Sequence, residues 1–316
     1  RWLHQSASQA TKQLGNQLGN QSAASKQGVA QILCWQSDEG AFVDWARFRL
    51  VGGEELPEVS QAYAQLRSLV GARCHQLGQQ FALALPEWNR QALATAHSQV
   101  NPANPLNPAA GALEEQRLVP LEAVLERVVA PLAAQQAVLL LVLDGLSTSI
   151  FRELFNRMEP LGYREVVPAQ LNTHLVGVAA FPTITEVSRA SLLCGKLTSG
   201  GQQQEKAGFA SHPALLAHCN ASAPPRLFHK GELSEESNLA ESVRNALANP
   251  AQKVLGIVFN AVDDHLSGPE QLRQRWQLDD LLLILPILRE ARAARRAVLI
   301  CADHGHILND NTMQVA

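Results

Sequence analysis

The sequence has few cysteines and no pair of them at the spacing of a redox or zinc motif. Its five cysteines are odd in number, lie far apart among 316 residues and include no CxxC pair. This pattern is typical of reduced thiols and argues against a disulfide framework. We therefore expect a cytoplasmic protein.

Other absences exclude further classes of protein. No stretch approaches the roughly 20 apolar residues of a membrane helix, and the first residues contain no apolar signal-peptide core. We therefore expect no membrane partner. The formal net charge of −3 argues against a broad basic surface for nucleic acid, although it is compatible with a small basic groove. No GxxxxGK[ST] loop is present, and no GxGxxG follows the first predicted strand, so the usual signals of P-loop and dinucleotide-binding proteins are missing.

The chain is predicted to contain two parts. Residues 1–110 favour a mainly helical N-terminal region that ends in a linker, because three prolines lie within 101–108. Residues 111–316 form the second part, which begins with a helix predicted from Glu114 to about Leu132. The sequence has no initiator Met and stops directly after a candidate active-site loop. We therefore expect a fragment whose second part is incomplete at its C-terminal end.

From Ala137 onward, short apolar runs alternate with helical patterns. We predict strands over 137–144, 175–180, 227–230, 254–260 and 297–302, and helices over 147–161, 186–194, 238–247 and 270–294. This alternation is typical of an α/β fold with a doubly wound, mostly parallel sheet.

Acidic and histidine side chains follow three of the predicted strands: Asp144, then Asp263 and His265, then Asp303 and His304. Because an α/β sheet gathers its ligands at the carboxyl ends of its strands, we expect these groups to converge on a metal site. Carboxylates and imidazoles together suit zinc or manganese, and magnesium is compatible with the carboxylates. We expect one or two divalent ions. The alternative for each group is a polar turn or a helix cap.

A hydroxyl group lies at a predicted strand-to-helix corner, Pro182-Thr-Ile-Thr185. Thr185 is placed near the helix N-terminus, where free N–H groups and the helix dipole favour an anion. A metal would lower the pKa of this hydroxyl and make it a nucleophile. The alternative is ordinary capping, because Thr followed by Glu is common at a helix start. Lys230, at the end of a predicted strand, is a candidate for neutralising a phosphate, and the alternative for it is a solvated strand end.

Taken together, these motifs resemble the PglZ family of BREX phage-defence systems, within the alkaline phosphatase superfamily. The resemblance covers about residues 115–316 and implies an alkaline-phosphatase-like core. Five segments carry it: Val142-Leu-Asp-Gly145, Pro182 to Gly195, Leu227-Phe-His-Lys230, Asn260 to Leu266 and Ala302-Asp-His-Gly-His306.

The resemblance implies a role for each matching position. Thr185 corresponds to the nucleophile that forms a covalent phospho-enzyme and contacts the metal. The ligands of the activating metal correspond to Asp144, Asp303 and His304. Asp263 corresponds to a ligand of a second metal, with His265 beside it, while His306 is expected to orient a ligand. Substrate binding is assigned to Ser188, which stands where diesterase members carry a phosphate-contacting Asn, and to Arg189 and Lys230.

Two features depart from the family pattern. A further His ligand usually comes from well beyond the Asp-His-Gly motif, whereas this sequence ends at Ala316. The family commonly has a His four residues after the second-metal Asp, and Ser267 occupies that position here. The second metal is therefore less well supported by the sequence than the first.

The function implied is that of a metal-dependent phosphohydrolase, acting on phosphodiesters in the manner of a phosphodiesterase or nuclease, within an antiphage defence complex. Its expected partners are other BREX proteins, contacted through the helical N-terminal region, and a phosphate ester substrate, with nucleic acid among the candidates. The alternative is a catalytically weak scaffold domain that docks other proteins of the complex. Replacing Asp144 by Asn discriminates between the two, since only an enzyme would lose metal binding and protection together.

Overall fold

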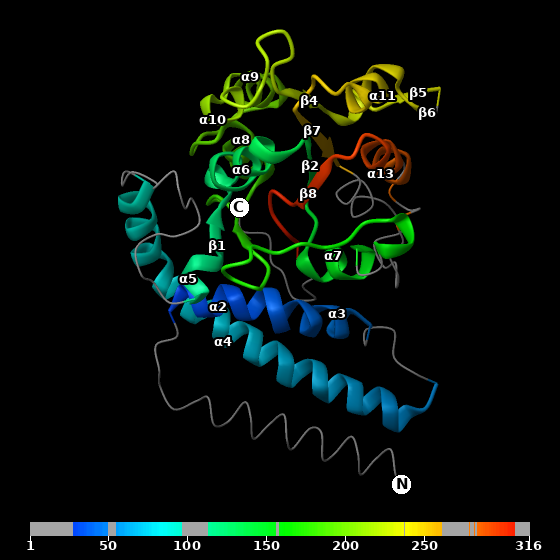
Figure 1. The fold of residues 1–316 in the computed structure, drawn as a ribbon. Helices are drawn as coiled ribbons and strands as arrows, with labels where there is room; N and C mark the ends of the chain where they lie inside the picture. Colours follow the sequence, from blue (N-terminus) through cyan, green and yellow to red (C-terminus); the bar gives the residue numbers. More distant parts are fainter. Residues whose placement is uncertain are drawn as a thin grey trace. The chain divides into compact units, whose positions relative to one another are not determined.

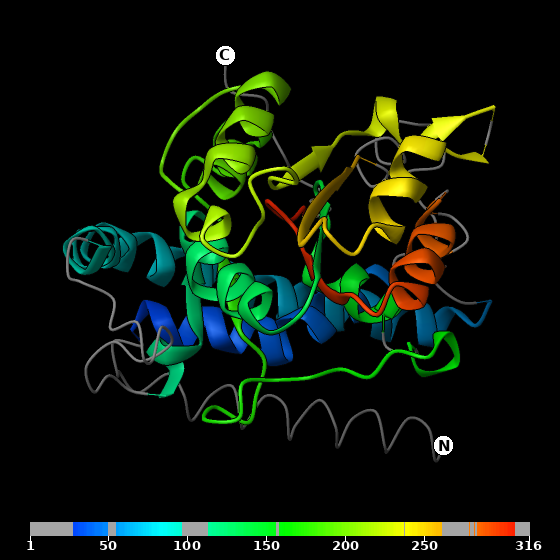
Figure 2. The same ribbon diagram turned by 45° about the horizontal axis from the view of Figure 1, so that its top comes forward.

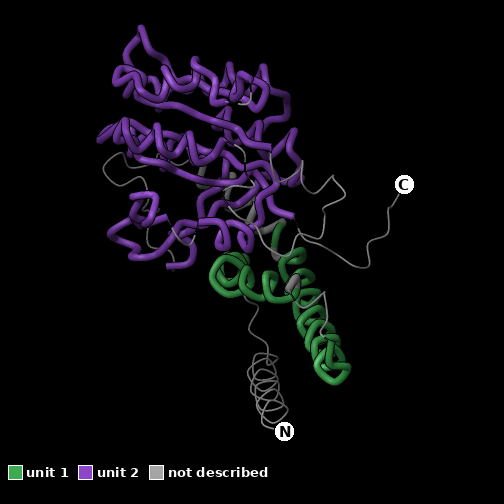
Figure 3. Tube along the Cα trace, turned by 90° about the vertical axis from the view of Figure 1, so that its right-hand side faces the viewer, with its two compact units in different colours: residues 1–98 green, residues 99–316 purple. Residues whose placement is uncertain are grey.

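A computed structural model describes residues 28–49, 55–96, 113–155, 158–236, 238–260, 278, 281 and 283–306 (Figure 1). The chain divides into two compact units, residues 1–98 and 99–316 (Figure 3). The predicted α/β class, with mostly parallel strands and a helical N-terminal region, is confirmed. Within the described residues, no helix combines the length and apolarity needed to cross a membrane. The predicted linker lies outside the described residues.

The described part of the first unit is helical. Its elements are α2 (Val29–Trp35), the π-helical turn η1 (Gln36–Gly40), α3 (Ala41–Arg49) and the long α4 (Pro57–Ala96). Proline suits the first position of α4, because its missing N–H would have no partner inside the helix there. Both α2 and α3 pack against α4, and the buried side chains include Val29, Ile32 and Leu77.

A four-stranded parallel sheet forms the centre of the second unit, in the order β4-β7-β2-β8. Its strands are β2 (Val138–Leu143), β4 (Arg226–Phe228), β7 (Val254–Phe259) and β8 (Ala297–Cys301). Val138 of β2 stands opposite Val254 on one side and Ala297 on the other, so β2 occupies an inner position. Every residue of β2 and β7 is buried. This explains their unbroken apolar sequences, since a doubly covered strand has no solvent face.

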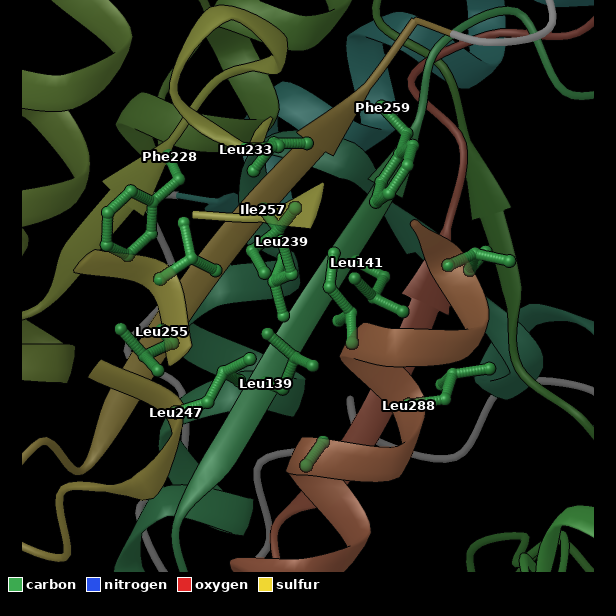
Figure 4. Close-up of a cluster of buried hydrophobic side chains, with 14 of the residues drawn as sticks. Leu139, Leu141, Phe228, Leu233, Leu239, Leu247, Leu255, Ile257, Phe259 and Leu288 are labelled. Atoms are coloured by element: carbon green, nitrogen blue, oxygen red, sulfur yellow. The ribbon is translucent and has the colours of Figure 1, made fainter. Parts of the chain in front are cut away.

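The side chains of β2 alternate between two apolar clusters, one on each face of the sheet. Leu139, Leu141 and Leu143 enter a cluster with α7 (Thr148–Phe155), α11 (Glu241–Ala248) and α13 (Ile284–Ala293) (Figure 4). Val138, Leu140 and Val142 enter the other cluster, whose helices are η4 (Leu125–Val129), α6 (Ala130–Gln135), α8 (Thr185–Cys194), α9 (Gln202–Ser211) and α10 (Pro213–Leu216). Figures 1 and 2 show these two groups of helices on opposite sides of the sheet. The sheet is therefore doubly wound.

The predicted helix over 114–132 is interrupted by a short strand. The segment contains α5 (Leu113–Arg117), β1 (Leu118–Pro120) and the 3-10 turn η3 (Leu121–Ala123), and helical structure runs on from there to Gln135. Pro120 has no N–H to continue a helix, and β1 pairs in parallel with β3 (Val176–Val178). The predicted strand over 175–180 contains β3, and among the described strands β3 pairs with β1 and not with the central sheet.

One predicted helix begins later than expected, and most of the first part of another lies outside the described residues. The one over 238–247 starts at Glu241, because Asn238–Leu239 forms strand β6, which pairs antiparallel with β5 (Ser234–Glu235). The described end of the one over 270–294 is α13, which starts at Ile284 after Leu283 in the left-handed region, φ 72°. The remaining short turns are η5 (Glu159–Leu161) and η6 (Lys230–Glu232).

Replacing Arg296 by Met is expected to lower the free energy of unfolding by about 3 kcal/mol, because several buried acceptors lose a charged donor. The buried guanidinium of Arg296 donates to four main-chain carbonyls at and beyond the end of α11: Ala246, Leu247, Asn249 and Gln252. Burial lowers the pKa of Arg296 to about 10, so it stays charged at neutral pH. Urea unfolding measures the loss. Arg296→Lys keeps the charge but not the planar guanidinium, so its free energy of unfolding should lie between those of the wild type and Arg296→Met. Equal stability of Arg296→Met and the wild type contradicts the prediction.

Candidate metal and nucleophile site

The carboxyl ends of the four parallel strands place polar residues along one edge of the sheet. Asp144 follows β2 and Asn260 follows β7, while Asp303 is separated from the end of β8 by Ala302. His229 follows β4, the outer strand on the opposite side of the sheet from β8. Because all four strands run parallel, these residues share the edge at which α/β proteins bind their ligands.

Asp144, Asp303 and His304 form a cluster that can hold a metal ion, since each offers a ligand atom within 4.8 Å of the others. The Nε2 atom of His304 lies 3.5 Å from Oδ1 of Asp144 and 3.7 Å from Oδ2 of Asp303. The Nδ1 of the same ring lies 3.2 Å from the carbonyl oxygen of Gly305, which can only accept. We therefore assign the proton of the neutral ring to Nδ1, which leaves the Nε2 lone pair available for a cation.

One oxygen of Asp303 is held by the main chain and the other is open. Oδ1 accepts from the N–H of Gly145 over 3.2 Å and from the N–H of His304 over 2.9 Å. Oδ2 is buried, and no hydrogen-bond donor reaches it among the residues that the structure describes. Burial, together with the negative charge of Asp144, raises the pKa of Asp303 to about 7.

A divalent cation fits this group of residues. Its donor set is two carboxylate oxygens and one imidazole nitrogen, which suits zinc or manganese and is compatible with magnesium. The charges agree as well. Of the three buried carboxylates in this region, Asp144 and Glu205 pair with the guanidinium of Arg189, and Asp303 does not. A cation bound at the site would therefore add positive charge beside Asp303.

Thr185 is the first residue of α8 and is partly exposed. Its Oγ1 lies 3.0 Å from Nε2 of His304 and 3.3 Å from Oδ1 of Asp144, so its one proton has two acceptors in reach. The first turn of a helix also leaves main-chain N–H groups without partners inside the helix, and these favour an anion. The structure thus places a hydroxyl, an anion-binding helix end and the candidate metal ligands together.

Ser188 and Arg189 make different contacts from those expected of substrate-binding residues. Ser188 is completely buried, and its Oγ accepts from the N–H of Ala180 and donates to the main-chain oxygen of Asp303. Arg189 is also buried, and its guanidinium contacts the carboxylates of Asp144 and Glu205. Both point into the protein from α8, because the third and fourth residues after Thr185 lie on the covered side of that helix.

The other predicted site residues fall into three groups. Lys230 is exposed at the start of η6, two strands away from β2 in the sheet. His306 donates from Nδ1 to the carbonyl of Gly145 over 2.6 Å, which holds that glycine in its left-handed turn, φ 73°. Asp263 and His265 lie outside the described residues.

Three polar residues of the site were not among the sequence candidates. Asn260 donates from Nδ2 to Oδ2 of Asp144 over 2.8 Å. Its position at the end of a buried strand was the signal that could have identified it. Glu205 and His229 are buried and contact each other. No sequence signal marks Glu205, because it lies in a polar segment, Gln202-Gln-Gln-Glu205, that is typical of an exposed helix.

Residues 124–316 match a family model described as the BREX system PglZ alkaline phosphatase-like domain. The matched range covers more than half of the chain and contains all the site residues discussed above. No curated protein gives a significant match to the chain.

Proposed function

The chain belongs to the PglZ family of BREX systems, whose domain is alkaline phosphatase-like, and on this basis we propose that it is a metal-dependent phosphohydrolase with Thr185 as nucleophile. The observation that carries the proposal is the position of the Thr185 hydroxyl, 3.0 Å from His304 and 3.3 Å from Asp144 at the start of α8. An isolated capping threonine would have no reason to face two candidate metal ligands.

Asp144, Asp303 and His304 would hold the metal ion. When bound, the ion supplies positive charge that lowers the pKa of the nearby hydroxyl and stabilises negative charge on oxygen. Zinc and manganese suit the donors best, with magnesium as a further candidate. A second ion, with Asp263 and His265 as ligands, is part of the proposal on the family resemblance alone.

The proposed reaction has two displacement steps, the first by Thr185 and the second by water. Thr185 loses its proton to solvent, and Oγ1 attacks phosphorus while the bond from phosphorus to the leaving oxygen breaks. The leaving oxygen takes a proton from water. The N-terminal N–H groups of α8 bind the phosphoryl oxygens during this step. For a diester, phosphorus keeps its second ester group while it is bound to Oγ1. Water then attacks this phosphorus, the Oγ1–phosphorus bond breaks, Oγ1 takes up a proton to regenerate Thr185, and a phosphate monoester leaves.

A phosphodiester is the preferred substrate class in this proposal. A monoester carries a second negative charge, and an arginine is the usual partner for it. Arg189 cannot serve, because its guanidinium contacts Asp144 and Glu205. Lys230, exposed at the start of η6, is the remaining candidate of the sequence analysis for neutralising phosphate. A diester, including the phosphodiester of a nucleic acid, carries one negative charge. It therefore needs fewer positive side chains than a monoester does.

The biological setting follows from the family. We place the activity in an antiphage BREX complex in the cytoplasm, with other BREX proteins as partners, contacted through the helices of the first unit. The five free thiols are consistent with a reducing compartment. The competing function is a catalytically weak scaffold, which the substitution of Ser267 for the usual histidine of the second metal site favours.

Hydrolysis of bis(p-nitrophenyl) phosphate and of p-nitrophenyl phosphate, with and without added metal, tests the proposal. The longest natural form of the chain should be used, after treatment with a chelator. We expect turnover only after zinc or manganese is added back, with the diester cleaved faster. If the metal-replete protein cleaves neither ester, and Asp144→Asn leaves antiphage protection unchanged, the scaffold function is correct instead.

A further inference from the structure

Four ionisable side chains form a continuous buried line that begins at the candidate metal site: Asp144, Arg189, Glu205 and His229. Their exposed fractions are 1%, 6%, 0% and 2%. Removing a charged group from water costs several kcal/mol, and well-packed apolar side chains often stabilise a fold equally well or better. Stability alone therefore gives little reason for this line. Its contact with a candidate metal ligand points to a role in the site.

Each link of the line is a direct polar contact. Arg189 donates from Nη1 to Oδ2 of Asp144, and from Nε to Oε1 of Glu205 over 3.0 Å. Nε2 of His229 lies 2.6 Å from Oε2 of Glu205. The buried Nδ1 of His229 has no hydrogen-bond acceptor among the residues that the structure describes, and the main-chain N–H of Glu232 caps this side chain. We therefore assign its proton to Nε2, where it is donated to Glu205, because a proton on Nδ1 would be left unpaired.

Two packed helices, α8 and α9, supply the middle of the line and hold Arg189 and Glu205 in place. Arg189 lies on α8 four residues after Thr185, so the two side chains leave the helix one turn apart. Glu205 lies on α9, which packs closely against α8. A Cβ added to Gly208 of α9 would come within 2.5 Å of the sulfur of Cys194 on α8. Glu205 therefore cannot move away from Arg189 unless two closely packed helices also move.

The contacts at Asp144 determine which of its oxygens faces the site. Oδ2 accepts from both Arg189 and Asn260. Oδ1 lies 3.3 Å from Oγ1 of Thr185 and 3.5 Å from Nε2 of His304. With two donors on one oxygen, the carboxylate cannot rotate without breaking both hydrogen bonds. Oδ1 is therefore the atom presented to a metal ion.

We propose that Glu205 and His229 are positioning residues of the metal site, and that they act on Asp144 through Arg189. Glu205 holds the guanidinium from behind, and His229 holds Glu205. Partners of this kind, one contact removed from the metal, fix the orientation of a ligand. The inference rests on the metal site of the proposed function, and it adds residues that touch neither metal nor substrate.

Glu205→Gln tests the proposal, because Gln keeps the shape of Glu and one acceptor oxygen but removes the charge that holds Arg189. The measurement is the dissociation constant of Mn²⁺, by isothermal titration of the metal-free full chain without substrate. We expect this constant to rise about tenfold, within the range for partners behind a metal ligand. Thermal unfolding of the metal-free protein, measured in parallel, separates this effect from a general loss of stability.

Two further variants give the proposal its specificity. Glu232→Gln makes the same chemical change at an exposed residue that accepts from the N–H of His229 and pairs with Lys206. Its Mn²⁺ affinity should stay within about twofold of wild type, because the buried line is intact. In an Arg189→Met background, Glu205→Gln should change the Mn²⁺ affinity less than about twofold. The reason is that Arg189, through which Glu205 acts on Asp144, is absent.

The outcomes decide between the roles. Unchanged Mn²⁺ affinity in a folded Glu205→Gln protein overturns the positioning role, and so does an equal effect in the Arg189→Met background. If Glu205→Gln does not fold, His229→Leu replaces it, and the same rise or its absence decides the question. Because affinity is measured without substrate, absent turnover alone contradicts only the proposed function. If Asp144→Asn also leaves Mn²⁺ affinity unchanged, the ion binds elsewhere and both proposals are wrong.

Discussion

Thr185→Ala is expected to reduce the turnover of a phosphodiester by at least about 10³-fold, since removing a nucleophile eliminates the covalent route. The same variant should bind Mn²⁺ with an affinity within a few-fold of wild type, because Asp144, Asp303 and His304 remain. Loss of turnover without loss of metal binding separates a nucleophile from a residue that only shapes the metal site. Steady-state kinetics and metal titration on one preparation provide both values.

The controls come from the same helix start. Thr185→Ser keeps the hydroxyl and should retain most of the turnover. Thr183→Ala removes an exposed hydroxyl two residues earlier and should leave turnover unchanged. Rapid acid quenching followed by mass spectrometry should detect one phosphoryl group, still carrying the second ester group of the diester, on the peptide that contains Thr185. Full turnover in Thr185→Ala contradicts the nucleophile and would leave direct attack by water as the mechanism.

The sequence predicted the central sheet and the convergence of Asp144, Asp303 and His304 at its edge. The strands β2 and β7 are buried apolar runs and β8 is a partly buried one, and such runs between helical segments are a strong signal of a parallel sheet. Asp144 and Asp303 are each the first carboxylate after such a run. Their convergence with His304 followed from one rule, that parallel strands end at one edge. Nothing in that argument needed the detailed packing.

The polar residues behind the site were not predictable in the same way. Arg189 and Glu205 are 16 residues apart, on different helices, and meet only because α8 packs against α9. A helical pattern shows which residues share a face, but it does not show which face a neighbouring helix covers with a matching charge. The hydrogen bonds of Ser188 were not predictable for the same reason, since they come from Ala180 and Asp303, which follow β3 and β8. Short strands such as β1 likewise depend on a distant partner.

Asp303→Asn is expected to weaken Mn²⁺ binding at pH 8 by at least about 100-fold. Losing a residue that only contacts a metal ligand costs up to about 100-fold in metal affinity, and losing a ligand itself should cost at least as much. Asn has nearly the shape of Asp but carries no charge. The Asn carbonyl oxygen can still accept from the N–H groups of Gly145 and His304, as Oδ1 does now. The change falls on Oδ2, which has no donor within the described structure. The fold of the loop should therefore survive while the charged ligand is lost.

The pH dependence of binding gives this prediction a second, independent readout. Burial and the charge of Asp144 raise the pKa of Asp303 to about 7, so at pH 6 the metal must displace a proton that is absent at pH 8. The sign follows directly, because the affinity of the wild-type protein should fall as pH falls. The expected decrease from pH 8 to pH 6 is about tenfold for the one proton displaced. In Asp303→Asn that proton is gone, so this part of the pH dependence should disappear.

The two readouts together distinguish a metal ligand from a structural carboxylate. A structural Asp303 would change the unfolding temperature when replaced, but it would leave both Mn²⁺ affinity and its pH slope as they are in wild type. A ligand loses affinity and slope together, because the oxygen that binds the ion is also the oxygen that binds the proton. If Asp303→Asn keeps the wild-type slope between pH 6 and pH 8, another group releases the proton, and Asp303 is not the ligand that limits binding.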